Sequence, residues 1–172
     1  MVTADALAPF AAPAFERAQS DPKPLAYLMA SSDQESGGVD FRLSAAVQTS
    51  GMREKRQPET RITDTNAKHL YWTPAQLVAH HTSNGCDLRP GDLLATGTVS
   101  GPTDESRACL AEITERGSKS FNLPNGETRT FLEDGDEVVF TGRAERAGRV
   151  SIGFGECRGR VEPAIAWPAA NS

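Results

Sequence analysis

The run from Tyr71 to Gly101 gathers the residue types that can bind a ligand or take part in chemistry. It contains two adjacent histidines, one cysteine and three hydroxyl residues at alternating positions: His80, His81, Cys86, Thr96, Thr98 and Ser100. Gly97 and Gly101 stand among those hydroxyls and leave room for a ligand to approach the backbone. Turns also use these residue types for purely structural reasons. The run therefore predicts either a ligand-binding loop or an ordinary turn rich in small residues.

The histidines are His69, His80 and His81. Two histidines that share a metal ion on a helix stand at positions i and i+4, whereas His80 and His81 are adjacent and project about 100° apart. We therefore expect structural roles, with one ring facing the core and hydrogen-bonded and the other nearer the surface.

The cysteines, Cys86, Cys109 and Cys157, are odd in number, widely spaced and free of any C-x-x-C pairing. This pattern argues against both a disulfide framework and a zinc site. Cys109 and Cys157 stand in strand-like runs, where small thiols are commonly buried. We expect reduced thiols that serve as packing residues.

Glu112 is an acidic residue in the middle of a strand-like run, 107–114. Strand periodicity places Cys109, Ala111 and Ile113 on one face of that run and Glu112 on the other. A charge in such a position is costly unless it is paired or exposed. Spacing alone leaves two interpretations open, an outward carboxylate on an edge strand and a functional acid.

A helix over about 74–84 must position the histidines. Thr73 is a good N-cap, Pro74 suits the first helical position, and Gln76 can reach back to the cap. Gly85 supplies the left-handed residue that closes a helix. Residues 89–92 then form a tight turn that leads into a predicted strand over 93–98.

The clearest strand covers 39–47, where apolar and polar residues alternate. The polar stretches 32–38 and 50–58 that flank it are predicted loops. Residues 66–71 are ambiguous between a helical turn and a strand.

Residues 119–123 and 127–132 form a predicted β-hairpin, because Asn125-Gly126 between strand-like runs is typical of a type I′ turn. A turn at 134–136 and strands at 138–141 and 150–154 follow.

The segment 1–24 is rich in Ala and Pro, and we expect it to wrap over the domain after a helical turn that follows Thr3. Leu7, Phe10 and Phe15 are the apolar residues that it can dock. With one good helix and hairpin-linked strands, the fold class is α+β and mainly β.

Length, composition and charge argue against several classes of protein. The chain has 172 residues, 38% of them hydrophobic, and a net charge of −5. This length suits one domain, and the scattered Lys and Arg residues make nucleic acid an unexpected partner. No apolar run is long enough to span a membrane, and the N-terminus has no export signal. We expect a soluble, cytoplasmic protein.

Three segments together resemble the fumarylacetoacetase family. Residues 80–101 fit HH-x-x-NGC-x-LRPGDLL-x-x-GT-x-SG, residues 2–10 resemble V-T-x-DAL-x-PF, and residues 21–25 read DPKPL. The resemblance implies that 1–172 is a single, incomplete C-terminal catalytic domain with a rolled, sandwich-like β fold. It also implies a homodimer or, for a fragment, self-association.

The same resemblance implies an enzyme that hydrolyses a carbon–carbon bond of the diketo acid fumarylacetoacetate in tyrosine and phenylalanine catabolism. In the family, a threonine at the position of Thr98 holds a substrate carboxylate. A glutamate fourteen positions later, here Glu112, orients the catalytic histidine. The base histidine and the ligands of a divalent metal, Mg²⁺ or Ca²⁺, precede the matched region. We therefore expect no metal ligands here and an inactive isolated chain.

Two departures and two alternatives accompany this interpretation. Residues 106–109 differ from the family's usual sequence, and Glu115 stands where the family has a tryptophan. The alternatives are an acylpyruvate-type hydrolase of the same superfamily and an inert fragment or interaction module.

Overall fold

The computed structural model describes residues 2–165. Its helices are short: α1 (Ala4–Leu7), α2 (Ser31–Ser36), α3 (Ser50–Glu54), α4 (Pro74–Thr82) and α5 (Leu110–Ile113). The strands are β1 (Ala11–Ala12), β2 (Gly38–Val39), β3 (Arg42–Gln48), β4 (Thr60–Asn66), β5 (Phe121–Asn122), β6 (Thr128–Arg129), β7 (Glu137–Ala144) and β8 (Ile152–Arg160). Within the described part, no helix has the length and apolar character needed to cross a membrane.

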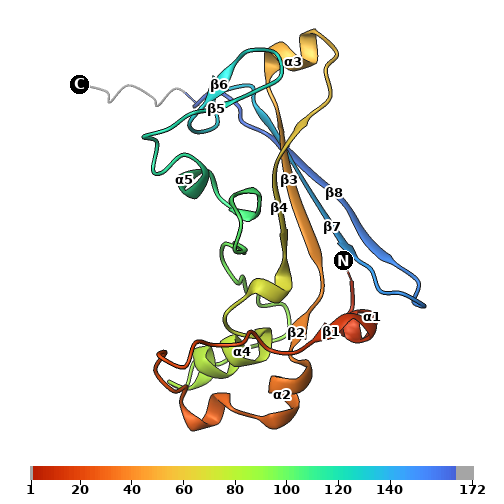
Figure 1. The fold of residues 1–172 in the computed structure, drawn as a ribbon, viewed down its shortest axis with the longest axis vertical. Helices are drawn as coiled ribbons and strands as arrows, with labels where there is room; N and C mark the ends of the chain where they lie inside the picture. Colours follow the sequence, from red (N-terminus) through yellow and green to blue (C-terminus); the bar gives the residue numbers. More distant parts are fainter. Residues whose placement is uncertain (1, 166–172) are drawn as a thin grey trace.

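A four-stranded antiparallel sheet in the order β4-β3-β7-β8 forms the frame of the molecule (Figure 1). In β3, Ala45 and Val47 are buried while Ala46 between them is only half-buried, as the alternating sequence predicts. The predicted strand over 39–47 is confirmed, although the structure divides it into β2 and β3. The antiparallel sheets and few short helices confirm the mixed, mainly β fold class.

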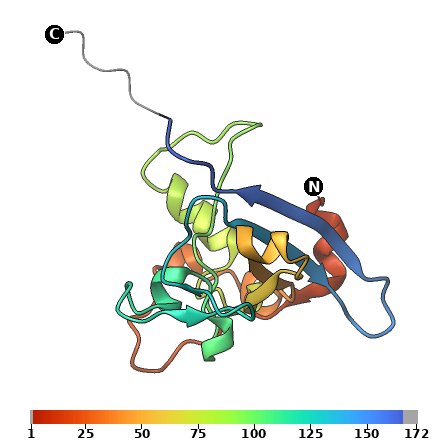
Figure 2. The same cartoon turned by 90° about the horizontal axis from the view of Figure 1, so that it is seen from above.

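The N-terminal segment docks chiefly through Phe10, whereas Phe15 stays 38% exposed. Thr3 caps α1 by accepting a hydrogen bond from the Ala6 amide (3.3 Å), and the side chain of Phe10 is 1% exposed. The following residues, β1, pair antiparallel with β2. The phenyl ring of Phe15 lies 5.7 Å from the ring of Tyr71. The segment thus lies against the elements that lead into α4 (Figure 2).

Helix α4 begins as the capping pattern predicts. The Thr73 side chain accepts from the Gln76 amide (3.1 Å), and the Gln76 side chain accepts from the Thr73 amide (3.0 Å), which completes a capping box. The helix ends at Thr82, slightly before the predicted end, and Gly85 follows with a φ of 86°. Residues 67–69 form a 3-10 turn, which resolves the ambiguity over 66–71.

Two predicted loops are wrong in part, because each contains a helix. Region 32–38 overlaps α2, and region 50–58 contains α3. The Thr49 side chain caps α3 by accepting from the Met52 amide (3.1 Å), and the side chain of Met52 is fully buried. The one buried apolar side chain of this turn is that of Met52, and a single apolar residue in a polar run produces no periodic pattern in the sequence.

The strand predicted over 93–98 is wrong. These residues have no regular structure, and Leu93 is 95% exposed. The preceding turn is confirmed by a hydrogen bond from the Asp92 amide to the Arg89 carbonyl (3.0 Å) and by the φ of 102° at Gly91. A short apolar run becomes a strand only beside a partner strand, and none in residues 2–165 pairs with it.

The predicted hairpin is confirmed as β5 and β6, but its turn type is wrong. The bonded turn has Pro124 and Asn125 at its centre and closes by a hydrogen bond from the Gly126 amide to the Leu123 carbonyl (3.0 Å). A type I′ turn needs positive φ at both central residues, and here only the following Gly126 has it, at 89°. Strands β7 and β8 confirm the last two predicted strands.

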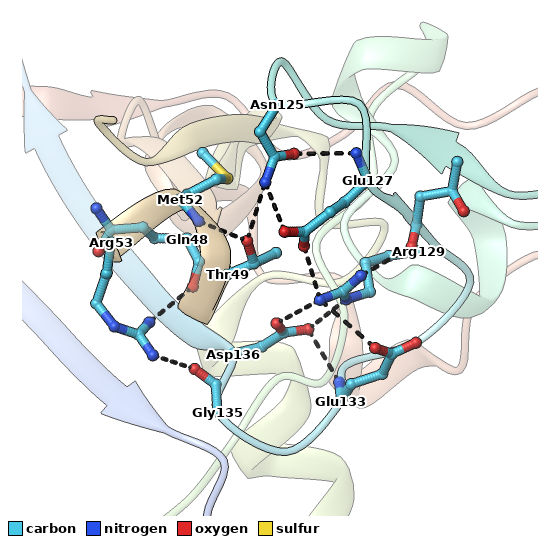
Figure 3. Close-up of polar contacts among 11 residues, drawn as sticks. Gln48, Thr49, Met52, Arg53, Asn125, Glu127, Arg129, Glu133, Gly135 and Asp136 are labelled. Carbon is cyan, nitrogen blue, oxygen red and sulfur yellow. Dashed lines mark hydrogen bonds and ion pairs between the residues drawn. The ribbon is translucent and has the colours of Figure 1, made fainter. Parts of the chain in front are cut away.

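A buried polar cluster joins the hairpin to the start of β7 and to α3 (Figure 3). Arg129 donates two hydrogen bonds to the carboxylate of Asp136, at 2.8 and 3.0 Å, and a third to Glu127 at 3.1 Å. Asn125 then links Glu127 to Thr49 at the start of α3. The hydrogen-bonded carboxylate of Asp136 raises the pKa of Arg129, so the guanidinium stays protonated inside the cluster.

Candidate functional site

Glu112 lies on α5, so the predicted strand over 107–114 is wrong. Cys109 is extended, with φ −141° and ψ 155°, and the chain turns into a helix directly after it. Glu112 is the third helical residue, and its carboxylate oxygen Oε2 accepts a hydrogen bond from the Ala108 amide (3.1 Å). A carboxylate that reaches back to a free amide stabilises the first turn of a helix.

The Glu112 carboxylate is also bound by the loop that carries the hydroxyl residues. Ser100 Oγ donates to Glu112 Oε2 at 2.5 Å, and the Ala108 amide lies 3.3 Å from the same Ser100 oxygen. Arg107 adds a hydrogen bond to the Glu112 carbonyl (3.3 Å). Tertiary contacts thus fix an exposed carboxylate against the G-T-x-S-G loop. Sequence reasoning singled out Ser100 as a hydroxyl but gave no signal for its bond to Glu112 or for the part of Ala108.

Thr98 lines a hollow of about 190 Å³ beside the sheet. The loop residues 97–99, Ala108 and residues of β3, β4 and β7 line this hollow. Gly97 has a φ of 77°, which lets the loop turn over the sheet. Ala108 lines the same hollow as Thr98 and donates its amide to Glu112, so it is a neighbour that the two candidate residues share.

The histidines do not lie as expected. His80 and His81 are both exposed, so the expectation that one of them faces the core is wrong. His80 Nδ1 lies 2.9 Å from the Tyr27 hydroxyl, and His81 Nε2 lies 3.3 Å from Cys86 Sγ. The physical reason is that the buried face of α4 carries Gln76, the third residue of the helix. Neither histidine lies on that face. Half-buried His69 is the remaining imidazole.

The cysteines also differ from expectation. All three are free, but Cys86 and Cys157 are exposed and Cys109 is half-buried. Burial was predicted for Cys157 from its strand-like sequence, and this is wrong because β8 forms the outer edge of the sheet.

The acidic and imidazole groups do not combine into a metal site within residues 2–165. No group of three or more His, Cys, Asp or Glu side chains there is arranged to hold an ion. The described residues therefore do not fit the divalent metal that the family resemblance implies.

Sequence reasoning also missed a second hollow. It measures about 350 Å³ and lies between residues 22–28 and α4, with Tyr71 and Trp72 in its wall. The Arg17 guanidinium lies 5.0 Å from the Tyr71 ring centre and 4.5 Å from that of Trp72, and it donates to Gln76 (3.1 Å). This contact joins the N-terminal segment to the start of α4.

Comparison with known proteins finds relatives that match almost the whole chain. The family profile described as "Fumarylacetoacetate (FAA) hydrolase C-terminal" matches residues 3–162. The chain is 47% identical to the fumarylacetoacetase of Arabidopsis thaliana over 163 residues, which cover 95% of this chain and 36% of that protein. It is 44% identical to the fumarylacetoacetases of Bos taurus and Homo sapiens, over 97% and 96% of this chain and 37% of each relative. The chain thus spans little more than a third of the length of these relatives. On this evidence the chain belongs to the fumarylacetoacetate hydrolase family and corresponds to its C-terminal region.

Proposed function

We propose that this chain provides the C-terminal part of a carbon–carbon hydrolase that cleaves 4-fumarylacetoacetate to fumarate and acetoacetate with consumption of one water. The observation that carries the proposal is the identity of 44–47% to fumarylacetoacetases across nearly the whole chain. Because the chain spans only 36–37% of those relatives, the remaining groups of the site come from outside the matched region.

Thr98 and Glu112 are the residues that we assign to this reaction. Thr98 is exposed and lines its hollow, and its hydroxyl has no hydrogen-bond partner within residues 2–165, which suits it to bind a carboxylate of the substrate. The Glu112 carboxylate orients a histidine that acts as general base on water, because a carboxylate that accepts the second imidazole N–H fixes the tautomer of the ring. The bonds from Ser100 and Ala108 support this role by holding the carboxylate in place.

The test is a chimera in which residues 3–162 replace the matched region of the Arabidopsis fumarylacetoacetase. We expect this chimera to hydrolyse fumarylacetoacetate, followed by the loss of substrate absorbance. Glu112→Gln should lower kcat by about 10²- to 10⁴-fold with little change in KM, which is the usual contribution of general-base assistance.

Glu115→Gln is the matched control, because Glu115 lies about one turn further along the chain and its carboxylate bonds only to Lys119 among the described residues. It should leave kcat within about twofold. Wild-type turnover by the Glu112→Gln chimera would remove Glu112 from the mechanism. A chimera that cleaves an acylpyruvate in preference to fumarylacetoacetate would overturn the substrate assignment.

The isolated chain should show no turnover above background. Thr98 and Glu112 can orient a substrate and a base, but residues 2–165 place no histidine against Glu112 and contain no metal cluster. Turnover by the chain alone that Glu112→Ala abolishes would show that the chain carries a complete site.

A further inference from the structure

Thr65 on β4 carries a buried hydroxyl that the described part of the chain leaves unsatisfied. The residue is 6% exposed, and its side-chain oxygen has no hydrogen-bond partner within residues 2–165. Thr63, two positions earlier and similarly buried, donates its hydroxyl to the Arg107 carbonyl (2.8 Å). A buried hydroxyl without a partner lowers stability, so most such groups in proteins are bonded. The exception at Thr65 therefore needs a partner that this part of the chain does not supply.

Thr65 lines the same hollow as Thr98. In the antiparallel register Thr65 stands opposite Leu43, and opposed residues point to the same face of a sheet. Leu43 and the loop residues 97–99 also line the hollow, so the loop lies beside that face. Two threonines from distant parts of the chain thus border one hollow.

The hollow suits one end of a substrate. Its volume of about 190 Å³ is below the about 300–1,000 Å³ of pockets that hold a whole small molecule. None of the described residues that line it is charged. Of its other hydroxyls, that of Thr63 bonds to a carbonyl, and those of Ser44 and Thr141 are paired with each other (2.6 Å). Thr65 and Thr98 are therefore the lining hydroxyls without a partner within residues 2–165.

We propose that Thr65 is a further substrate-binding residue, whose hydroxyl donates to the same substrate carboxylate as the hydroxyl of Thr98. The inference rests on the proposed function, which assigns Thr98 to a carboxylate of fumarylacetoacetate. A carboxylate has two acceptor oxygens, so Thr98 alone leaves one of them without a donor in a hollow that the substrate has emptied of water. A move between staggered positions about the Cα–Cβ bond turns a threonine hydroxyl by about 120°, which lets the shielded oxygen of Thr65 turn toward the hollow.

The first experiment asks whether the Thr65 hydroxyl serves folding. In urea unfolding of the purified chain, Thr65→Val should keep or raise the urea midpoint, because it removes a buried donor that has no partner. Thr63→Val is the matched control on the same strand, and it should lower the midpoint, because it removes a bonded hydroxyl. A midpoint that falls as far in T65V as in T63V would show that the fold uses the Thr65 hydroxyl, and would overturn the proposal.

The second experiment measures binding in the chimera of residues 3–162 with the Arabidopsis fumarylacetoacetase. Isothermal titration calorimetry gives the Kd of each product, fumarate and acetoacetate, and Thr98→Val identifies which of them carries the bound carboxylate. Thr65→Val should raise the Kd of that same product, and the KM for fumarylacetoacetate, by about tenfold or more, because a hydrogen bond to a charged group is lost. The value of kcat should stay within about twofold, because this bond forms equally in the ground state and the transition state.

Two variants control this measurement. Thr65→Ser keeps the hydroxyl and should keep both Kd and KM within about twofold of the starting chimera. Thr60→Val lies on the same strand but outside the lining of the hollow, and it should change neither value.

This inference and the proposed function fail in different ways. A chimera that binds a product through Thr65 and Thr98 but does not cleave fumarylacetoacetate would support the inference and overturn the proposed function. An active chimera whose Kd and KM are unchanged by Thr65→Val would overturn the inference alone. A chimera that binds neither product would also overturn the inference.

Discussion

Replacement of Arg129 by methionine should strongly destabilise the fold. The Arg129 side chain is 10% exposed and that of Asp136 is 0% exposed, and the two are joined by a bidentate pair (Figure 3). Met keeps much of the side-chain volume but leaves the buried Asp136 carboxylate with one hydrogen bond in the cluster, from the Glu133 amide at 2.9 Å. Removing one partner of a buried ion pair costs about 3–5 kcal/mol.

That loss is large beside the about 5–15 kcal/mol by which domains are usually stable. A decrease of about 3 kcal/mol raises the unfolded fraction more than a hundredfold. Urea unfolding followed by circular dichroism at pH 7 measures the free energy of unfolding of each variant. The double variant R129M/D136N should lose less than R129M alone, because the buried charge is then gone.

Arg42→Met is the matched control for this experiment. Arg42 pairs with Asp64 on the surface, where its side chain is 60% exposed, so its loss should cost at most about 1 kcal/mol. If R129M and R42M lower the free energy of unfolding equally, the buried cluster is not what holds the hairpin to β7.

Two other properties follow from the structure. Thr73→Ala should lower the free energy of unfolding by about 1–2 kcal/mol, because the buried hydroxyl caps α4 and donates to Asp33 (2.8 Å). Thr73→Ser keeps the hydroxyl and should keep most of the stability. Equal urea midpoints for the two variants would contradict the capping role. The pKa of Glu137 lies below its ordinary value, chiefly because Arg158 bonds to the carboxylate. This pair therefore stabilises the protein above about pH 4 and is lost as the pH falls through the lower, folded-state value. Glu137→Gln should thus reduce stability at pH 7 but much less at pH 3, and the same loss at both pH values would exclude this linkage.

The sequence alone determined the family and the locally encoded elements. The cap at Thr73, the turn closed by Gly126 and the alternation that buries Ala45 and Val47 each depend on residues close together in the chain. Caps, turns and periodic faces are short-range properties, so a single sequence can reveal them. The assignments of Thr98 and Glu112 rest on the family resemblance, because local spacing alone left the role of Glu112 open, and they stay predictions.

Only the tertiary structure decided whether short segments with a strand-like sequence form a strand, a helix or a loop. Region 107–114 has the alternation of a strand, yet the carboxylate of Glu112 finds Ser100 and the Ala108 amide and the segment turns into a helix. Residues 93–98 have the apolar character of a strand but no partner strand within 2–165, and Cys157 is exposed because β8 is an edge. Whether such a run pairs, coils or stays open depends on which distant residues come to lie beside it, and that information is not local.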